Sequence, residues 1–91
     1  MSTNKSDKFT VIGSLECPWC VKAQELLSAF EKNYEFQVHA FNSKAIKEAK
    51  KTYDHPTIPI VLLSDSSGNE FLIGGYSDLE KFITDEENAK N

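Results

Sequence analysis

The chain contains no arginine, and its ten basic residues are all lysine. Arginine is the side chain best suited to forked contacts with phosphates and base edges, and the formal net charge is −4. Nucleic acid is therefore not an expected partner. No apolar run approaches the length of a membrane-spanning helix, which argues against a membrane protein. The polar segment 1–8 has no signal-peptide pattern, so secretion is not expected.

Cysteine and histidine are scarce, with two of each. Two cysteines cannot build a disulfide framework, so a reducing, cytoplasmic setting is predicted. A zinc site would need two further ligands, and His39 and His55 are expected on a strand and on a distant loop beside the active site. No metal site is therefore predicted. The 91 residues with 40% hydrophobic content predict one small domain, residues 1–91, with a single core.

The hydrophobic spacing predicts an α/β chain in the order β-α-β-α-β-β-α, with a structured part at about 8–84. Strands are expected at about 8–13, 35–41, 60–63 and 70–73. The first helix is expected at about 18–33. The second is expected at about 43–53, with Asn42 or Ser43 as its N-cap. The glycine bend at 74–78 should open the last helix. The first helix should bury Ala23, Leu26, Leu27 and Phe30. Residues 1–7 should be a disordered polar lead and residues 85–91 a frayed end.

The only two cysteines lie where the first strand should pass into the first helix, in Cys17-Pro18-Trp19-Cys20. Proline is best tolerated at the first helical position, which makes Cys17 the expected N-cap. Its sulfur would face the free N–H groups of Trp19 and Cys20 and the positive end of the helix dipole, which favour a thiolate. Cys17 is thus the predicted nucleophile. Cys20, about one turn on, is placed to form or resolve a disulfide with it.

Three motifs occur together in this order: Cys17-Pro18-Trp19-Cys20, Thr57-Ile58-Pro59 and Gly74-Gly75-Tyr76-Ser77-Asp78. In this order and spacing the chain closely resembles a dithiol glutaredoxin over about residues 8–84. The resemblance implies a thioredoxin-like fold with a four-stranded mixed sheet of order 2-1-3-4 flanked by helices. It also implies a monomeric glutathione-dependent thiol–disulfide oxidoreductase that reduces protein disulfides and glutathione mixed disulfides.

The same resemblance implies the roles of individual residues. Cys17 and Cys20 would be catalytic. Glutathione would contact Trp19, Lys22, Thr57, Ile58, Pro59, Gly75, Tyr76, Ser77 and Asp78. A cis bond before Pro59 would free the backbone of Ile58 to pair with the cysteinyl part of glutathione. The γ-glutamyl end would meet the helix-start N–H groups after the glycine bend, with Asp78 taking its ammonium group.

Glutathione is expected as the reductant, with no tightly bound cofactor. Glutaredoxin potentials of about −200 to −230 mV lie within reach of a glutathione pool near about −220 to −260 mV. Disulfide-containing client proteins are the expected partners, and ribonucleotide reductase is a client suggested by the family. Two alternatives stay open: a redoxin reduced by thioredoxin reductase, and a non-enzymatic iron–sulfur carrier. Pro18 and Cys20 argue against the carrier, because they favour disulfide chemistry.

The sequence departs from the family pattern at three positions near the cysteines. Ser14 stands where many members carry lysine or arginine, Glu16 places a negative charge directly before Cys17, and Trp19 replaces the commoner tyrosine. The first two weaken the support for a thiolate and for the glycyl carboxylate of glutathione. Lys22 and either Lys47 or Lys51 are the candidates to replace the lost cation.

Overall fold

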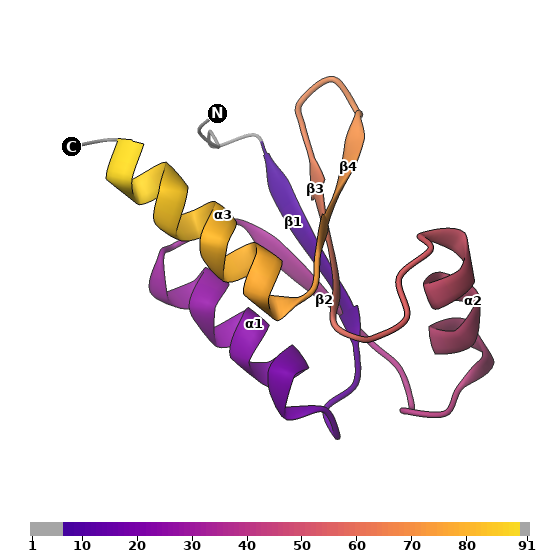
Figure 1. The fold of residues 1–91 in the computed structure, drawn as a ribbon. Helices are drawn as coiled ribbons and strands as arrows, with labels where there is room; N and C mark the ends of the chain where they lie inside the picture. The colour runs from indigo at the N-terminus through magenta and orange to yellow at the C-terminus, as the bar shows by residue number, and fades with distance from the viewer. Residues whose placement is uncertain (1–6, 90–91) are drawn as a thin grey trace.

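A computed structural model describes residues 7–89 of the chain. The predicted polar lead falls almost wholly outside this range, as do residues 90 and 91 of the predicted frayed end. The elements follow the predicted order β-α-β-α-β-β-α (Figure 1). Their bounds are β1 Lys8–Gly13, α1 Pro18–Ala29, β2 Tyr34–Val38, α2 Lys44–Thr52, β3 Ile60–Ser64, β4 Glu70–Gly74 and α3 Tyr76–Ala89.

The four strands form one mixed sheet in the predicted order β2-β1-β3-β4. β2 runs parallel to β1, whereas β3 is antiparallel to both β1 and β4. Helices α1 and α3 cover one face of the sheet and α2 covers the other (Figure 1). β1 is therefore an inner strand between two helical layers, and it delivers the chain to the first cysteine from the middle of the molecule.

Alternate residues of the inner strands fill the two faces of the sheet, as strand geometry requires. Phe9 and Val11 of β1 pack with Leu27 of α1 and Leu79 of α3, whereas Ile12 packs with Ile46 of α2. The run Ile60–Leu63 is buried throughout, which confirms the prediction of a strand covered on both sides. None of the helices in residues 7–89 combines the length and apolar character needed to cross a bilayer.

The first helix is shorter than predicted, and this moves Phe30 out of the core. α1 ends at Ala29, Phe30 is its C-cap residue, and Glu31 follows with a left-handed φ of 55°. Because the chain leaves the helix there, the side chain of Phe30 does not continue the buried stripe and is 41% exposed. Ala23 and Leu27 are fully buried as predicted, but the expected burial of Phe30 is wrong.

The second strand ends at Val38 rather than near Phe41. Its partner β1 ends at Gly13, which pairs with Val38, so no neighbouring strand continues the ladder beyond that point. Phe41 is exposed in the connection to α2. That helix begins as predicted, because the hydroxyl of Ser43 accepts a hydrogen bond from the N–H of Ile46 at 3.3 Å.

The last helix continues to Ala89, so the prediction of a frayed end from residue 85 is wrong. Glu86 lies in the added turn, is 3% exposed, and forms an ion pair with Lys32 from the connection between α1 and β2. A carboxylate is buried in a protein only when a charge or hydrogen bond compensates its loss of water. The contact with Lys32 thus holds this polar turn on the body of the protein.

Replacing Lys32 should test this ion pair. In Lys32→Met the buried Glu86 carboxylate would lose the cation of this ion pair, so the free energy of unfolding should fall by about 3–5 kcal/mol. Lys81→Met, at an exposed position of α3, is the matched control and should change it by less than about 0.5 kcal/mol. Urea denaturation measures both. Equal stability of the two variants would show that the buried pair does not hold the end of α3.

Candidate active site

Cys17 is the N-cap of α1, as predicted, and Pro18 is the first helical residue. The Cys17 sulfur makes no capping hydrogen bond, however, and the N–H of Cys20 bonds to the carbonyl oxygen of Cys17 at 3.1 Å. The prediction that the Cys17 sulfur faces a free backbone N–H of Cys20 is therefore wrong. Instead, the thiol points to the carbonyl oxygen of Ile58, 3.9 Å away. This contact joins the start of α1 to the loop before β3.

Cys20 is fully buried beneath Cys17, against the end of β1. A side chain at Gly13 would collide with the Cys20 sulfur, and its Cβ would come within 3.0 Å of the Cys20 Cβ. Glycine therefore allows α1 to approach the strand here. Burial raises the pKa of the Cys20 thiol to about 12, and the neighbouring Cys17 adds to the increase. At neutral pH, Cys20 is a protonated thiol.

The turn between the cysteines and β1 is closed by Ser14, one of the departures from the family pattern. Its hydroxyl accepts a hydrogen bond from the N–H of Glu16 at 3.2 Å, and its carbonyl oxygen accepts one from the N–H of Cys17 at 3.2 Å. Ser14 is 1% exposed, whereas the side chain of Glu16 is exposed. Ser14 thus fixes the direction in which the chain enters α1.

Alkylation should distinguish the two thiols. Because the thiolate is the reactive form, iodoacetamide at pH 8 should label Cys17 in the folded protein and leave Cys20 unmodified. The pKa of Cys20 lies near 12 instead of 9.0, so its labelling should rise only in strongly alkaline solution. Peptide mapping by mass spectrometry locates the adduct, and urea-unfolded protein, which should carry two adducts, is the control. Labelling of Cys20 in the folded protein at the rate of Cys17 would contradict the assignment.

The close approach of Gly13 to Cys20 can be tested by a double-mutant cycle. Gly13→Ala should destabilise the protein by about 1–3 kcal/mol, the usual cost of overpacking. In a Cys20→Ala background this cost should fall by about 0.5–3 kcal/mol, because the colliding sulfur is gone. Gly75→Ala is the matched control, since a Cβ there meets no atom closer than 3.5 Å. An unchanged cost in the Cys20→Ala background would mean that the strain lies elsewhere.

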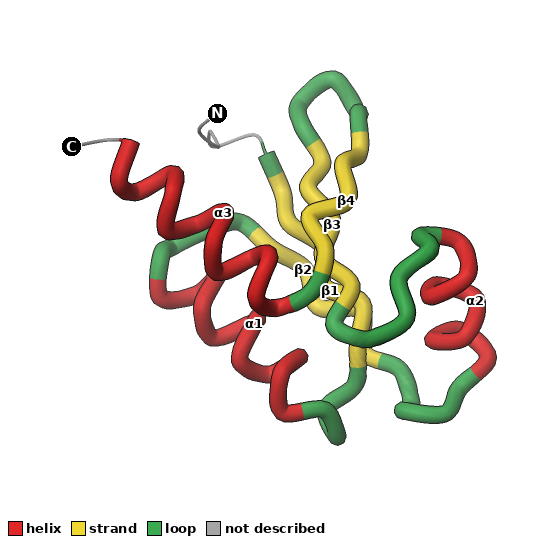
Figure 2. Tube along the Cα trace, in the orientation of Figure 1, coloured by secondary structure: helices red, strands yellow, loops and turns green. Residues whose placement is uncertain are grey.

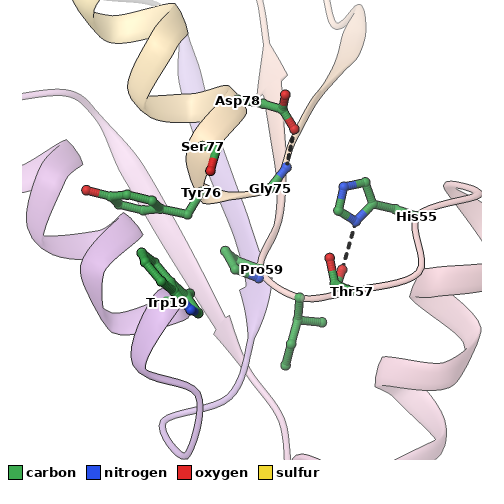
Figure 3. Close-up of a pocket in the computed structure, with 9 residues that line it drawn as sticks. Trp19, His55, Thr57, Pro59, Gly75, Tyr76, Ser77 and Asp78 are labelled. Carbon is green, nitrogen blue, oxygen red and sulfur yellow. Dashed lines mark hydrogen bonds between the residues drawn. The ribbon is translucent and has the colours of Figure 1, made fainter.

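A pocket of about 380 Å³ lies between the start of α1, the loop before β3 and the start of α3 (Figure 3). These three segments are far apart in the sequence, and the loop before β3 runs back from α2 to the sheet (Figure 2). The pocket is lined by Trp19, His55, Thr57, Ile58, Pro59, Gly75, Tyr76, Ser77 and Asp78. It thus brings together every residue predicted for the binding site except Lys22, and it adds His55.

Two aromatic rings form one wall of this pocket. The centroids of Trp19 and Tyr76 are 5.3 Å apart, with the rings tilted by 43°. The amino group of Lys22 lies 4.5 Å from the centroid of the Trp19 ring. The hydroxyl of Tyr76 bonds to Glu80, 3.3 Å away, so Tyr76 offers the pocket its ring. Burial, with the charge of Glu80, raises the pKa of Tyr76. Lys22 supports the wall and does not line the pocket.

Directly before Tyr76, the glycine bend fixes the start of α3. Gly74 has a φ of 124°, which glycine adopts without strain, and a Cβ there would collide with Asp78. The N–H of Gly75 donates to one carboxylate oxygen of Asp78 at 3.0 Å. The bend therefore presents the carboxylate of Asp78 and the first N–H groups of α3 at one end of the pocket.

Pro59 forms the floor of the pocket, and the Ile58–Pro59 peptide bond is cis, as the resemblance implied. Lys47 and Lys51, the other candidate cations, are exposed on α2 and do not line the pocket. In residues 7–89 no group of three or more histidine, cysteine, aspartate and glutamate side chains is arranged to hold a metal ion. Neither protein-family models nor curated protein sequences gave a match to the chain.

Sequence reasoning placed His55 on a loop beside the active site and did not assign it a binding role. The only feature of the sequence that could have assigned His55 to the binding site was its position two residues before Thr57. The structure places its ring in the pocket, where its Nδ1 lies 2.8 Å from the carbonyl oxygen of Thr57. A histidine in a loop cannot be assigned to a pocket from local pattern, because the course of the loop decides where the ring lies.

Proposed function

We propose that this protein is a glutathione-dependent thiol–disulfide oxidoreductase of the glutaredoxin type, with a thioredoxin-like fold. The observation that carries the proposal is the contact between the Cys17 thiol and the carbonyl oxygen of Ile58, 3.9 Å away. Ile58 lines the 380 Å³ pocket, so the Cys17 sulfur contacts one of the lining residues of a cavity that would hold a small peptide thiol. The paired buried cysteine and the cis-proline loop support the same activity.

In this proposal, glutathione lies along the pocket with its sulfur next to Cys17. Its cysteinyl backbone pairs with the backbone of Ile58, in the manner of a peptide added to the edge of a strand. Its γ-glutamyl carboxylate meets the N–H groups at the start of α3, where the helix dipole is positive. Asp78 accepts the ammonium group at the same end, and the Trp19 ring covers the peptide.

The exchange chemistry assigns the first step to Cys17. The Cys17 thiolate attacks the glutathione sulfur of a mixed disulfide, forms a Cys17–glutathione disulfide and releases the client thiolate. The thiolate of a second glutathione then attacks the glutathione sulfur of this intermediate, which yields glutathione disulfide and regenerates Cys17. Cys20 does not enter this route, which agrees with its burial and its pKa of about 12.

Reduction of a protein disulfide needs the second cysteine. Attack by Cys17 joins the client to Cys17 and releases one client thiolate. Cys20 then attacks the Cys17 sulfur, its proton is taken up by the departing second client thiolate, and the Cys17–Cys20 disulfide remains for two glutathione molecules to reduce. Once Cys17 is part of a disulfide it carries no charge, so its contribution to the raised pKa of Cys20 is removed.

The proposed partners are glutathione and cytoplasmic proteins with reducible disulfides, and ribonucleotide reductase is a client to test first. The pocket favours this proposal over the alternative of a redoxin that is reduced by thioredoxin reductase. Such a protein needs the cysteine pair and Pro59 but has no need for Gly75 and Asp78 to hold a γ-glutamyl group. An iron–sulfur carrier needs Cys17 free of a competing thiol, whereas Cys20 lies directly beneath it.

A coupled assay should test the function and the division of labour between the cysteines. With glutathione, glutathione reductase and a glutathione mixed disulfide, the protein should turn over substrate. Cys17→Ser should abolish all exchange, because it removes the nucleophile. Cys20→Ser should keep reduction of the mixed disulfide and lose most reduction of a protein disulfide, because that route needs the second thiol.

Two further measurements discriminate the alternatives. If the protein turned over substrate with thioredoxin reductase but not with glutathione, it would be a redoxin reduced by thioredoxin reductase, and the proposal would be wrong. A brown, cluster-absorbing dimer after anaerobic purification would favour the iron–sulfur carrier. If a variant that retains only Cys20 were the active one, the assignment of the nucleophile would be overturned.

A further inference from the structure

The imidazole of His55 is held in one orientation by the loop that carries it. The backbone N–H of His55 donates to the carbonyl oxygen of Lys50 at 2.9 Å, which ties the residue to the end of α2. Its Nδ1 lies 2.8 Å from the carbonyl oxygen of Thr57. A carbonyl oxygen only accepts hydrogen bonds, so Nδ1 must carry the proton. In the neutral ring, Nε2 then has the free lone pair.

Nε2 faces the end of the pocket formed by Gly75 and Asp78. Figure 3 shows the ring between Thr57 and Gly75, with the second nitrogen on the side of Asp78. A Cβ at Gly75 would lie 3.8 Å from Nε2 and 3.5 Å from Cε1. The ring therefore packs against the same residue whose N–H binds the Asp78 carboxylate at 3.0 Å. In residues 7–89, no group donates a hydrogen bond to Nε2.

These groups make a site with two kinds of acceptor. Asp78 contributes a carboxylate oxygen that is not engaged by Gly75, and His55 contributes the lone pair of Nε2. Among residues 7–89, Asp78 is the only carboxylate that lines the pocket, and no lysine of this range lines it. A ligand group that satisfies both acceptors must donate at least two hydrogen bonds and is best positively charged. A primary ammonium group has these properties.

We propose that His55 is a ligand-binding residue that, together with Asp78, holds the α-ammonium group of an amino-acid-like end of the substrate. The inference rests on the proposed glutathione-dependent function, in which that end is the γ-glutamyl group. The carboxylate on the same carbon then faces the first N–H groups of α3. His55 thereby selects thiol peptides that have a free amino group at this end over those that lack it.

A matched substitution separates this role from support of the loop. In His55→Asn, the side-chain amide can take the place of Nδ1–H and donate to the carbonyl oxygen of Thr57, but nothing replaces Nε2. The probes are S-methylglutathione, which cannot undergo exchange, and its analogue without the γ-glutamyl amino group. Calorimetric titration at pH 8 gives both dissociation constants.

The wild-type protein should bind S-methylglutathione more tightly than the analogue without the amino group. In His55→Asn this preference should fall by about 3- to 10-fold, the worth of one hydrogen bond, with little change in affinity for the analogue. His39→Asn replaces the other histidine, which does not line the pocket, and should leave the preference unchanged.

An unchanged preference in His55→Asn would overturn the role of His55 while leaving the proposed function intact. An equal loss of affinity for both probes would also overturn it, because it would show that His55 only shapes the loop. If the wild-type protein bound neither probe, the glutathione-dependent function would fail, and the role of His55 would fail with it.

Discussion

The contact between Gly13 and Cys20 sets how closely α1 can approach the inner strand β1. The Cys20 sulfur occupies the space that any larger residue at position 13 would fill. With α1 at this distance, its N-cap Cys17 reaches the loop before β3 and faces the carbonyl oxygen of Ile58. The same packing gives two chemically identical side chains different properties, because Cys20 is fully buried whereas Cys17 retains 7% of its surface.

Features governed by neighbours in the sequence were predictable. Pro18 marked the start of α1, Ser43 capped α2, and the apolar run at 60–63 formed a strand buried on both faces. The parallel pairing of the first two strands followed from the helix between them, whereas the sheet order was implied by the resemblance to glutaredoxins. The resemblance, carried by three short motifs, had also named every residue that lines the pocket except His55.

Three features did not follow from the local sequence pattern. Phe30 continues the apolar spacing of α1, but the left-handed turn at Glu31 removes it from the core. Glu86 lies in a polar tail that local pattern assigns to solvent, but it is buried and pairs with Lys32, far away in the sequence. His55 enters the pocket because the loop after α2 folds back over the sheet. For Glu86 and His55 the arrangement of separate elements overrides the local preference, whereas for Phe30 the turn at the end of the helix does so.

The pocket has few charged side chains with which to bind a charged ligand. Lys22 is turned onto Trp19, the lysines of α2 lie outside the pocket, and Asp78 supplies its one carboxylate. Attraction by net charge would therefore favour a cationic group near Asp78 and leave a ligand carboxylate to the backbone. Backbone N–H groups at the start of α3 can accept that carboxylate without a cation, because they have no partner within the helix. A ligand that carries an ammonium and a carboxylate on one carbon satisfies both features, whereas an anion lacking the ammonium meets only one of them.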